Sequence, residues 1–236
     1  VSIVKDIKKN KDIKGVVLRI NSPGGSAIAS EVIWKEINEL NKIKPVFVSM
    51  SNLAASGGYY ISCGGEKIFC YENTITGSIG IYFMKFNIQN LLKSLGITKD
   101  KIKTNERSDI FHANFEKSDE FEKIIYEKKI KEFYMHFLSR VSENRKMTIE
   151  EINKIAQGRV WIGKDAKRLN LVDDIYFLDD IYLNLAKKLN IENDFQIKIL
   201  INKENNFIDE VFNSFFKIKE FLKVNFLSLK NNFDIK

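Results

Sequence analysis

The pattern of apolar and polar residues along the chain predicts short buried strands that alternate with amphipathic helices. Two runs rich in β-branched residues, VVLRI at 16–20 and VFVSM at 46–50, are typical of buried strands. Between them, apolar residues recur at helical spacing over 27–42. The same criteria predict further strands over 67–71, 78–83, 101–104, 159–163 and 195–201, helices over 1–13, 58–63, 87–95, 117–145, 148–158 and 177–189, and a helix followed by a turn over 164–174.

Strands that alternate with helices indicate an α/β fold, with a parallel or mixed sheet covered by helices on both faces. The 236 residues suit one large domain with an appended segment. Because the composition changes near residue 203, we expect a domain over 1–202 and a separate segment over 203–236. Phe and Lys recur at helical spacing over 207–229. This pattern predicts a basic amphipathic helix that docks on the domain or a neighbouring subunit, or lies on a membrane surface.

The basic excess of the chain does not point to nucleic acid. The net charge of +7 comes from lysines spread along the sequence, without a base-reading motif beside them. We therefore expect no nucleic-acid partner, and an anionic membrane surface is the partner that this charge favours. No cluster of His, Cys and carboxylate residues has the spacing of metal ligands, so we expect neither a metal nor an organic cofactor.

The cysteines and the ends of the chain are less informative. Cys63 and Cys70 are too few for a disulfide scaffold and read as buried free thiols. No apolar run approaches the roughly 20 residues of a membrane span, and no signal peptide opens the chain. A start at Val1 is typical of an excised domain, which leaves an N-terminal membrane anchor open.

Three glycine-rich turns follow predicted strands within 60 residues of one another. They are NSPGG at 21–25, AASGG at 54–58 and TGSIG at 76–80. Glycine lets the backbone approach a ligand closely, and it leaves N–H groups free to bind an oxyanion. Three such turns at strand ends predict a functional site at that edge of the sheet.

Ser56 is the candidate nucleophile of this site. It lies between two alanines and two glycines, whose small size would let a substrate carbonyl reach its Oγ. The alternative is that Ser56 is only the N-cap of the following helix. His112 and His136, the two histidines of the chain, both lie in charged stretches and are predicted to be surface residues rather than catalytic bases.

The motifs together resemble the S49 peptidase family, of the signal peptide peptidase A type. The resemblance rests on LRINSPGG at 18–25, MSNLAASGGYYIS at 50–62, TGSIG at 76–80 and IAQGRVWIGKDAKRLNLVD at 155–173, and it spans roughly residues 1–190. It implies the ClpP/crotonase-like fold, which is built of repeated ββα units.

The resemblance also assigns roles to residues. The family's nucleophilic serine falls on Ser56, and its oxyanion donors fall on the backbone N–H groups of Gly25 and Gly57. The second serine, which orients the base, falls on Ser78. The family base is a lysine, which must be desolvated to be neutral and to take the serine proton.

The sequence departs from the family at this lysine. In the matching stretch TNERSDIF at 104–111, the lysine position is Ser108, and the neighbouring Arg107 stays protonated. Three interpretations remain open. A partner subunit supplies the lysine, as in double-length family members whose serine-bearing half this chain resembles. Lys101 or Lys103 acts after a rearrangement, with Lys103 as the nearer candidate. Or the chain is inactive.

The leading hypothesis is a serine endopeptidase that degrades signal peptides or other short apolar peptides. By family resemblance we expect a homo-oligomer or hetero-oligomer with S49-type subunits, associated with the membrane of a bacterial cell envelope and acting outside the cytoplasm. The alternative is an inactive S49-like subunit that binds peptides or acts as a scaffold. A third reading is a crotonase-type acyl-CoA enzyme, which shares the fold and the oxyanion hole.

Overall fold

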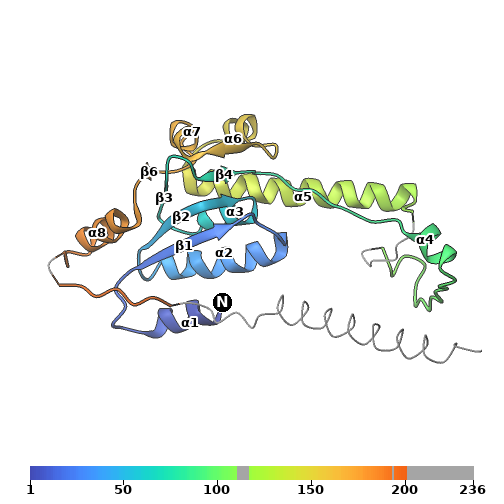
Figure 1. The fold of residues 1–236 in the computed structure, drawn as a ribbon, viewed down its shortest axis with the longest axis horizontal. Helices are drawn as coiled ribbons and strands as arrows, with labels where there is room; N and C mark the ends of the chain where they lie inside the picture. Colours follow the sequence, from blue (N-terminus) through green and yellow to red (C-terminus); the bar gives the residue numbers. More distant parts are fainter. Residues whose placement is uncertain (111–116, 193, 201–236) are drawn as a thin grey trace, which may run out of the picture. The chain divides into compact units, whose positions relative to one another are not determined.

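The computed structural model describes residues 1–110, 117–192 and 194–200. Figure 1 shows a central sheet flanked by helices. The strands of the sheet are β1 (Val16–Ser22), β2 (Val46–Ala55), β3 (Lys67–Cys70), β4 (Ile75–Gly77), β5 (Val160–Ile162) and β6 (Asp174–Ile175). The helices are α1 (Ser2–Lys9), α2 (Ala27–Asn41), α3 (Gly57–Ser62), α4 (Gln89–Ser94), α5 (Glu120–Arg145), α6 (Ile149–Ile155), α7 (Gly163–Arg168) and α8 (Leu178–Lys188).

Strand β2 is the centre of the sheet and pairs with three other strands. It runs parallel to β1 along one side. On its other side it pairs in parallel with β3 through its first half and with β4 through its second half. Strand β6 extends the sheet in parallel from β3, whereas β5 pairs antiparallel with β4. The sheet is therefore mixed, and the predicted α/β class is confirmed.

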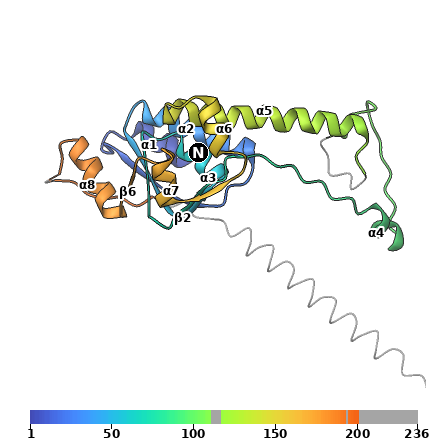
Figure 2. The same ribbon diagram turned by 90° about the horizontal axis from the view of Figure 1, so that it is seen from above.

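The first half of β2 is buried on both faces of the sheet. Val48 and Met50 belong to the main core, whereas Phe47 lies in a separate cluster with residues of β3 and α8. A strand covered on both faces reads as a continuous apolar run, which is why the VFVSM segment signals a strand without alternation. Figure 2 shows α8 at the far end of the sheet from α5.

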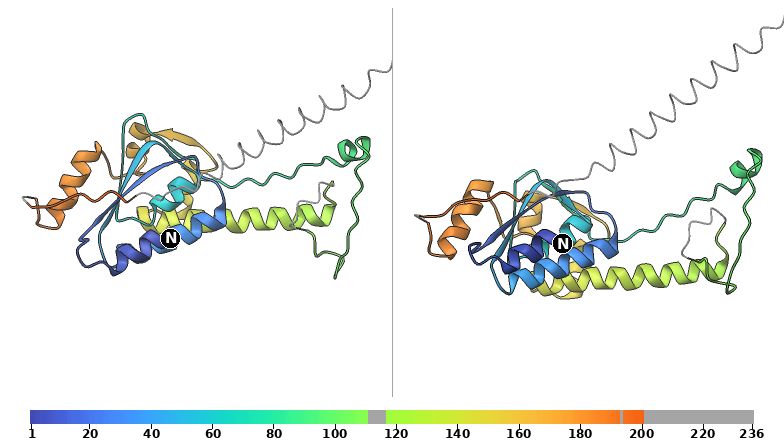
Figure 3. Two further views of the ribbon diagram at one scale, coloured as in Figure 1. Left: turned by 60° about the horizontal axis from the view of Figure 1, so that its bottom comes forward. Right: turned by 90° about the horizontal axis from the view of Figure 1, so that it is seen from below.

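The longest helix, α5, joins the core through its C-terminal half only. Phe137, Leu138 and Val141 are buried in the main cluster, whereas Phe121 and Ile124 near the start of the helix are exposed. Figures 1 and 3 show α5 continuing well beyond the sheet, with α4 lying on the same side as its outer end.

Three predicted strands are absent from the structure. Residues 78–83 and 101–104 have no regular secondary structure, and neither do 195–200, the described part of the strand predicted over 195–201. Their β-branched and aromatic residues favour strands locally, but within the described residues they find no partner strand, and pairing is what stabilises a strand. Strand β4 forms just before the first of them instead.

Residues 1–195 form one compact unit. The predicted segment 203–236 and His112 lie outside the described residues. Within the residues that the structure describes, no helix has the length and apolarity that a membrane crossing requires.

Asp173 ties together β3 and the end of α5. Its carboxylate accepts hydrogen bonds from the backbone N–H of Ile68 at 2.8 Å and from the buried guanidinium of Arg145 at 2.8 Å. Burial acts to raise the pKa of the Asp173 carboxyl, but the hydrogen bonds from Ile68 and Arg145 outweigh it, so this pKa lies below its usual value. The ionised carboxylate therefore stabilises the fold.

We predict that Asp173→Asn lowers the free energy of unfolding at pH 7 by about 2 kcal/mol, because a buried guanidinium loses its charged partner. The pKa of this carboxyl is lower in the folded chain than in the unfolded chain, where it is about 4. The ionised carboxyl therefore stabilises the fold at pH values above about 4, and this stabilisation is lost as the pH falls through the pKa of the folded state. Urea titrations from pH 7 to pH 3 should therefore show a shallower acid loss in the variant. If the free energy of unfolding fell equally steeply with decreasing pH in both proteins, the stabilising role of the ionised Asp173 carboxylate would be contradicted.

Candidate active site

Ser56 lies at a strained bend between β2 and α3. Its φ is +51° and its ψ is −119°, a conformation that a residue with a side chain rarely adopts. The bend is held by the Ser56 N–H, which donates to the carbonyl of Gly77 at 2.9 Å. A strained strand-to-helix turn also presents the serine nucleophile in other hydrolase folds.

The side chain of Ser56 is not engaged as a helix cap. The residue occupies the N-cap position of α3, but its Oγ makes no capping hydrogen bond. Within the part of the chain that the structure describes, no hydrogen bond to this hydroxyl is found, and the residue is half-buried. The structure therefore leaves the Ser56 hydroxyl free to react, and capping does not explain its presence.

The first glycine turn packs directly on the Ser56 turn. A Cβ built on Gly24 would lie 2.6 Å from the Gly57 nitrogen and 2.8 Å from the Ser56 Cβ. A Cβ built on Gly57 would lie 3.3 Å from the Gly25 nitrogen, and one on Gly58 would lie 2.9 Å from the Ser22 carbonyl oxygen. No side chain fits between the two turns, so the glycines allow a backbone-to-backbone approach.

This approach brings together two free donors. Among the described residues, neither the N–H of Gly25 nor the N–H of Gly57 donates a hydrogen bond. Gly25 has open space on the side where a Cβ would stand. A pair of unpartnered N–H groups beside a serine hydroxyl is the arrangement that stabilises a developing oxyanion.

A cavity of about 180 Å³ opens in front of Ser56. This is the volume of about six waters. Its walls come from the first glycine turn, α2, α3, the segment after β4 and α5. Its lining comprises Gly25, Ala27, Ser30, Glu31, Ser56, Gly57, Tyr60, Ile81, Phe133, His136 and Phe137.

One charged group lines the cavity from α2. The carboxylate of Glu31 accepts a hydrogen bond from Arg140 of α5 at 2.9 Å and another from the hydroxyl of Tyr60. Burial acts to raise the pKa of Glu31, but the bonds from Arg140 and Tyr60 leave this pKa below its usual value. Burial raises the pKa of the Tyr60 hydroxyl, and the bond to Glu31 raises it further. Arg140 also stacks 3.8 Å from the ring centroid of Trp34.

Ser78 lies one residue beyond the carbonyl that holds the Ser56 bend. It too has a positive φ, of +50°, and its N–H donates to the carbonyl of Arg159 at 2.7 Å. Its side chain is half-buried and is not part of the cavity lining. The second and third glycine turns are therefore adjacent in the structure, through Ser56 and Gly77.

The structure does not bring Lys103 to Ser56. The ammonium group of Lys103 pairs with Asp109 at 2.8 Å, and Lys101 pairs with the same carboxylate. This hydrogen bond from Lys103 lowers the pKa of Asp109.

The same stretch is attached to the outer end of α5, where Arg107 pairs with Asp119. Between Asp119 and Phe133, the first α5 residue that lines the cavity, the helix rises by roughly 20 Å. Ser108 belongs to this distant stretch. The family's lysine position in this chain is therefore remote from the chain's own serine.

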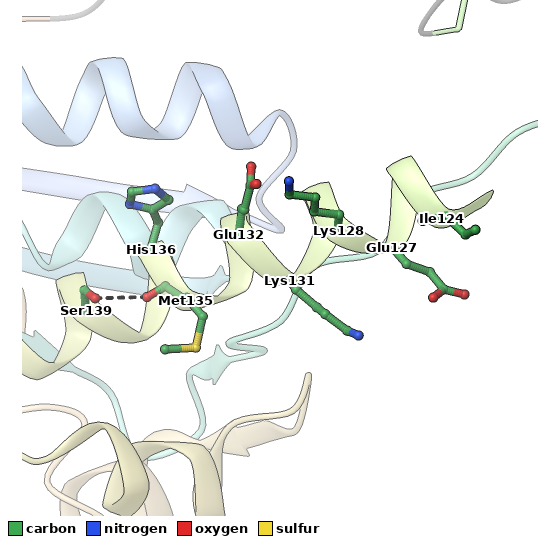
Figure 4. Close-up of a pocket in the computed structure, with 8 residues that line it drawn as sticks. All are labelled: Ile124, Glu127, Lys128, Lys131, Glu132, Met135, His136 and Ser139. Atoms are coloured by element: carbon green, nitrogen blue, oxygen red, sulfur yellow. Dashed lines mark hydrogen bonds between the residues drawn. The ribbon is translucent and has the colours of Figure 1, made fainter. Parts of the chain in front are cut away.

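His136 lines the cavity, which the sequence did not predict. The residue is exposed, in agreement with its charged surroundings in the sequence, but α5 carries it to the opening before Ser56. Figure 4 shows its imidazole pointing from α5 toward α2, while Met135 and Lys131 point away. Glu31 and Arg140 were also missed, because 109 residues separate the two partners. The sequence feature that could have indicated a shared position on the cavity wall was the four-residue spacing of His136 and Arg140 on a predicted helix, which places both on one helix face.

The cysteines do not compete for the role of nucleophile. Cys63 and Cys70 are buried and free, as predicted. Burial raises the pKa of each thiol to about 12, so neither is a thiolate at neutral pH. The described residues hold no group of three His, Cys, Asp or Glu side chains suited to a metal ion.

We predict that Gly24→Ala slows the reaction of Ser56 with a fluorophosphonate at least about 10²-fold, because the new Cβ would push apart the two turns. The variant should also lose about 1–3 kcal/mol of stability. Gly96→Ala is the matched control, since Gly96 also has a positive φ, of +70°, but open space around its Cβ position. Equal slowing in both variants would show that strain alone, not the contact with Ser56, explains the effect.

Several known proteins with similar sequences are named as peptidases. The chain is 41% identical over 188 residues to Protease 4 of Haemophilus influenzae, which is 79% of this chain and 30% of that protein. It is 34% identical over 188 residues to the chloroplastic serine protease SPPA of Arabidopsis thaliana, with coverage of 80% and 28%. An Enterococcus faecium protein named as an SppA signal peptide peptidase is 37% identical, with coverage of 78% and 54%. The chain thus spans about a third to a half of these relatives.

The family match covers part of the cavity wall, namely α3, the segment after β4 and α5, and it begins after the first glycine turn. The family model of peptidase family S49 matches residues 38–192, from the end of α2 to the end of the described core. Peptidases of this family have a ClpP/crotonase-like α/β fold, in agreement with the mixed sheet and flanking helices found here. The chain belongs to peptidase family S49.

Proposed function

We propose that this chain is a serine endopeptidase domain in which Ser56 is the nucleophile. One observation carries the proposal. A hydroxyl on a strained bend lies beside the N–H groups of Gly25 and Gly57 at the wall of an open cavity, and none of the three groups has a hydrogen-bond partner among the described residues. Membership of a peptidase family supports the same activity.

The reaction follows from this geometry. The Ser56 Oγ attacks the scissile carbonyl carbon while a base accepts its proton, and the carbonyl oxygen becomes an oxyanion held by the N–H groups of Gly25 and Gly57. The oxyanion then collapses, the C–N bond breaks, and the amine leaves with a proton from the base. Water hydrolyses the resulting ester in a second, similar step. Ser78, which follows the Gly77 carbonyl that accepts from the Ser56 N–H, is proposed to orient the base.

The lining of the cavity favours apolar substrate side chains. Ile81, Phe133 and Phe137 contribute carbon surface, and the carboxylate of Glu31 is already neutralised by Arg140. We therefore propose short apolar peptides as substrates, and signal peptides among them, in line with the names of the relatives. The proposed location is the bacterial cell envelope, at a membrane surface that the basic chain favours.

By the family resemblance the position of the base lysine is Ser108 in this chain, and the stretch that holds it is tied to the outer end of α5 by Arg107 and Asp119. A lysine from another S49-type subunit of a homo-oligomer or hetero-oligomer would complete the site, and so would a base within the chain's own cavity.

A second candidate function is an inactive subunit that holds peptides in the same cavity. The separation of Lys103 from Ser56 is the observation that favours it. The two functions differ in one respect: only the peptidase needs the Ser56 hydroxyl to react.

We predict that Ser56→Ala lowers the cleavage rate of a fluorogenic apolar peptide by at least about 10³-fold, because the nucleophile is lost. Ser94→Ala is the control, since the exposed Ser94 hydroxyl donates to the Leu91 carbonyl within helix α4. Equal rates for Ser56→Ala and the unaltered chain would remove Ser56 from its role. A folded chain that neither cleaves peptides nor reacts with a fluorophosphonate would favour the inactive subunit or a peptidase that lacks its partner subunit.

A further inference from the structure

The cavity in front of Ser56 has the size of one aromatic ring. Its volume is about 180 Å³. A protein cavity of about 150 Å³ lined by Leu, Ile and Phe side chains binds benzene, so the space before Ser56 would hold a single ring that carries a small substituent. Ile81, Phe133 and Phe137 supply carbon surface to the wall, which favours an apolar side chain of the substrate.

Part of the lining is polar, and this part is built around Glu31. The carboxylate Oε1 accepts a hydrogen bond from Nη2 of Arg140 at 2.9 Å, and Oε2 accepts from the hydroxyl of Tyr60 and from Nε of Arg140 at 3.5 Å. Burial acts to raise the pKa of Glu31, but the hydrogen bonds from Arg140 and Tyr60 hold this pKa below its usual value. Glu31 is therefore a carboxylate at neutral pH.

The Glu31 carboxylate has room for one more donor. Its two oxygens accept about four hydrogen bonds when ionised. Among the described residues, Arg140 and Tyr60 supply three of these bonds, and one of the two acceptor positions of Oε1 is left. The side chain of Glu31 is 42% exposed and lines the cavity, so a donor inside the cavity can reach it. The hydroxyl of Ser30, also in the lining, already donates to the carbonyl of Ser26 at 2.9 Å.

Two contacts fix the place of Glu31 relative to the nucleophile. Ser30, the residue before Glu31, lies against the Ser56 turn, since a Cβ built on Gly57 would be 2.5 Å from the Ser30 Oγ. Tyr60, whose hydroxyl donates to Glu31, is held to the same turn by its N–H, which donates to the carbonyl of Ser56 at 2.9 Å. The carboxylate is thus tied to the turn that carries the nucleophile through both α2 and α3.

We infer that Glu31 is a specificity-determining residue that accepts a hydrogen bond from the hydroxyl of a substrate tyrosine in this cavity. The inference rests on the proposed peptidase function, because the tyrosine would be the residue whose carbonyl Ser56 attacks. A phenol offers an apolar ring to the carbon surface of the wall and one donor to Glu31. Phenylalanine fills the same space but leaves the acceptor unused. Lysine and arginine side chains are disfavoured, because Arg140 already neutralises Glu31 and would repel a second cation.

The test is the affinity of the full chain for two short apolar peptide amides that differ only in a C-terminal Tyr or Phe. Ser56→Ala is used to prevent cleavage, and binding is measured by calorimetry at pH 7. The Tyr peptide should bind about tenfold more tightly, because a hydrogen bond to a charged acceptor is worth at least about this factor. Adding Glu31→Gln should lower the affinity for the Tyr peptide to about that for the Phe peptide.

Glu143→Gln is the matched control, because Glu143 is another carboxylate that pairs with Arg140, at 3.4 Å, but it is not part of the cavity lining. This variant should keep the tenfold preference. Equal affinities for the two peptides in the Ser56→Ala chain overturn the inference, whether or not Glu31→Gln folds. A preference that survives Glu31→Gln overturns it too, and so does a failure of the Tyr peptide to bind. The proposed function is judged separately, by the reaction of Ser56 with a fluorophosphonate in the unaltered chain, so the two failures are distinguishable.

Discussion

The geometry of the candidate active site depends on the contact between two backbone turns. The Gly24–Gly25 turn after β1 and the Ser56–Gly58 turn after β2 approach so closely that a single Cβ on Gly24 would overlap the Gly57 nitrogen. Parallel pairing of β1 with β2 brings both turns to the same edge of the sheet. Since the bend at Ser56 is also bonded to Gly77, all three glycine turns meet there. Among the residues that the structure describes, two N–H donors and one hydroxyl are left without partners as a result, which is the preorganised arrangement that oxyanion stabilisation needs.

The second feature of the chain is the separation of its serine from its family lysine position. The stretch that holds Ser108 is tied to the outer end of α5 through Arg107 and Asp119, roughly 20 Å along the helix from the cavity. Lys101 and Lys103 lie in the same stretch, and both pair with Asp109 rather than with Ser56. In this conformation the stretch that holds Ser108 supplies no base to Ser56, so the proposed peptidase depends on a base from elsewhere, and the inactive subunit does without one.

Sequence reasoning recovered the parts of the fold whose signals are local. A few neighbouring residues are enough to predict these parts. They are the strands at 16–20 and 46–50, the helix over 27–42 and the capping box of Thr148 and Glu151. The strands predicted at 78–83 and 101–104 failed because strand formation depends on a partner that the local sequence does not specify. Ser56 and its glycine turns were predictable from motifs. The cavity wall could not be predicted from motifs, because Glu31 on α2 and Arg140 on α5 are far apart in the sequence and meet only in the folded chain.

The central claim is that the Ser56 hydroxyl faces the N–H groups of Gly25 and Gly57 across the space that a peptide carbonyl would fill. A crystal structure of the fluorophosphonate adduct tests it most directly. The account predicts phosphorus bonded to the Ser56 Oγ, with its terminal oxygen about 2.7–3.1 Å from both nitrogens. An adduct on another residue, or a terminal oxygen directed into solvent away from both glycines, would contradict it.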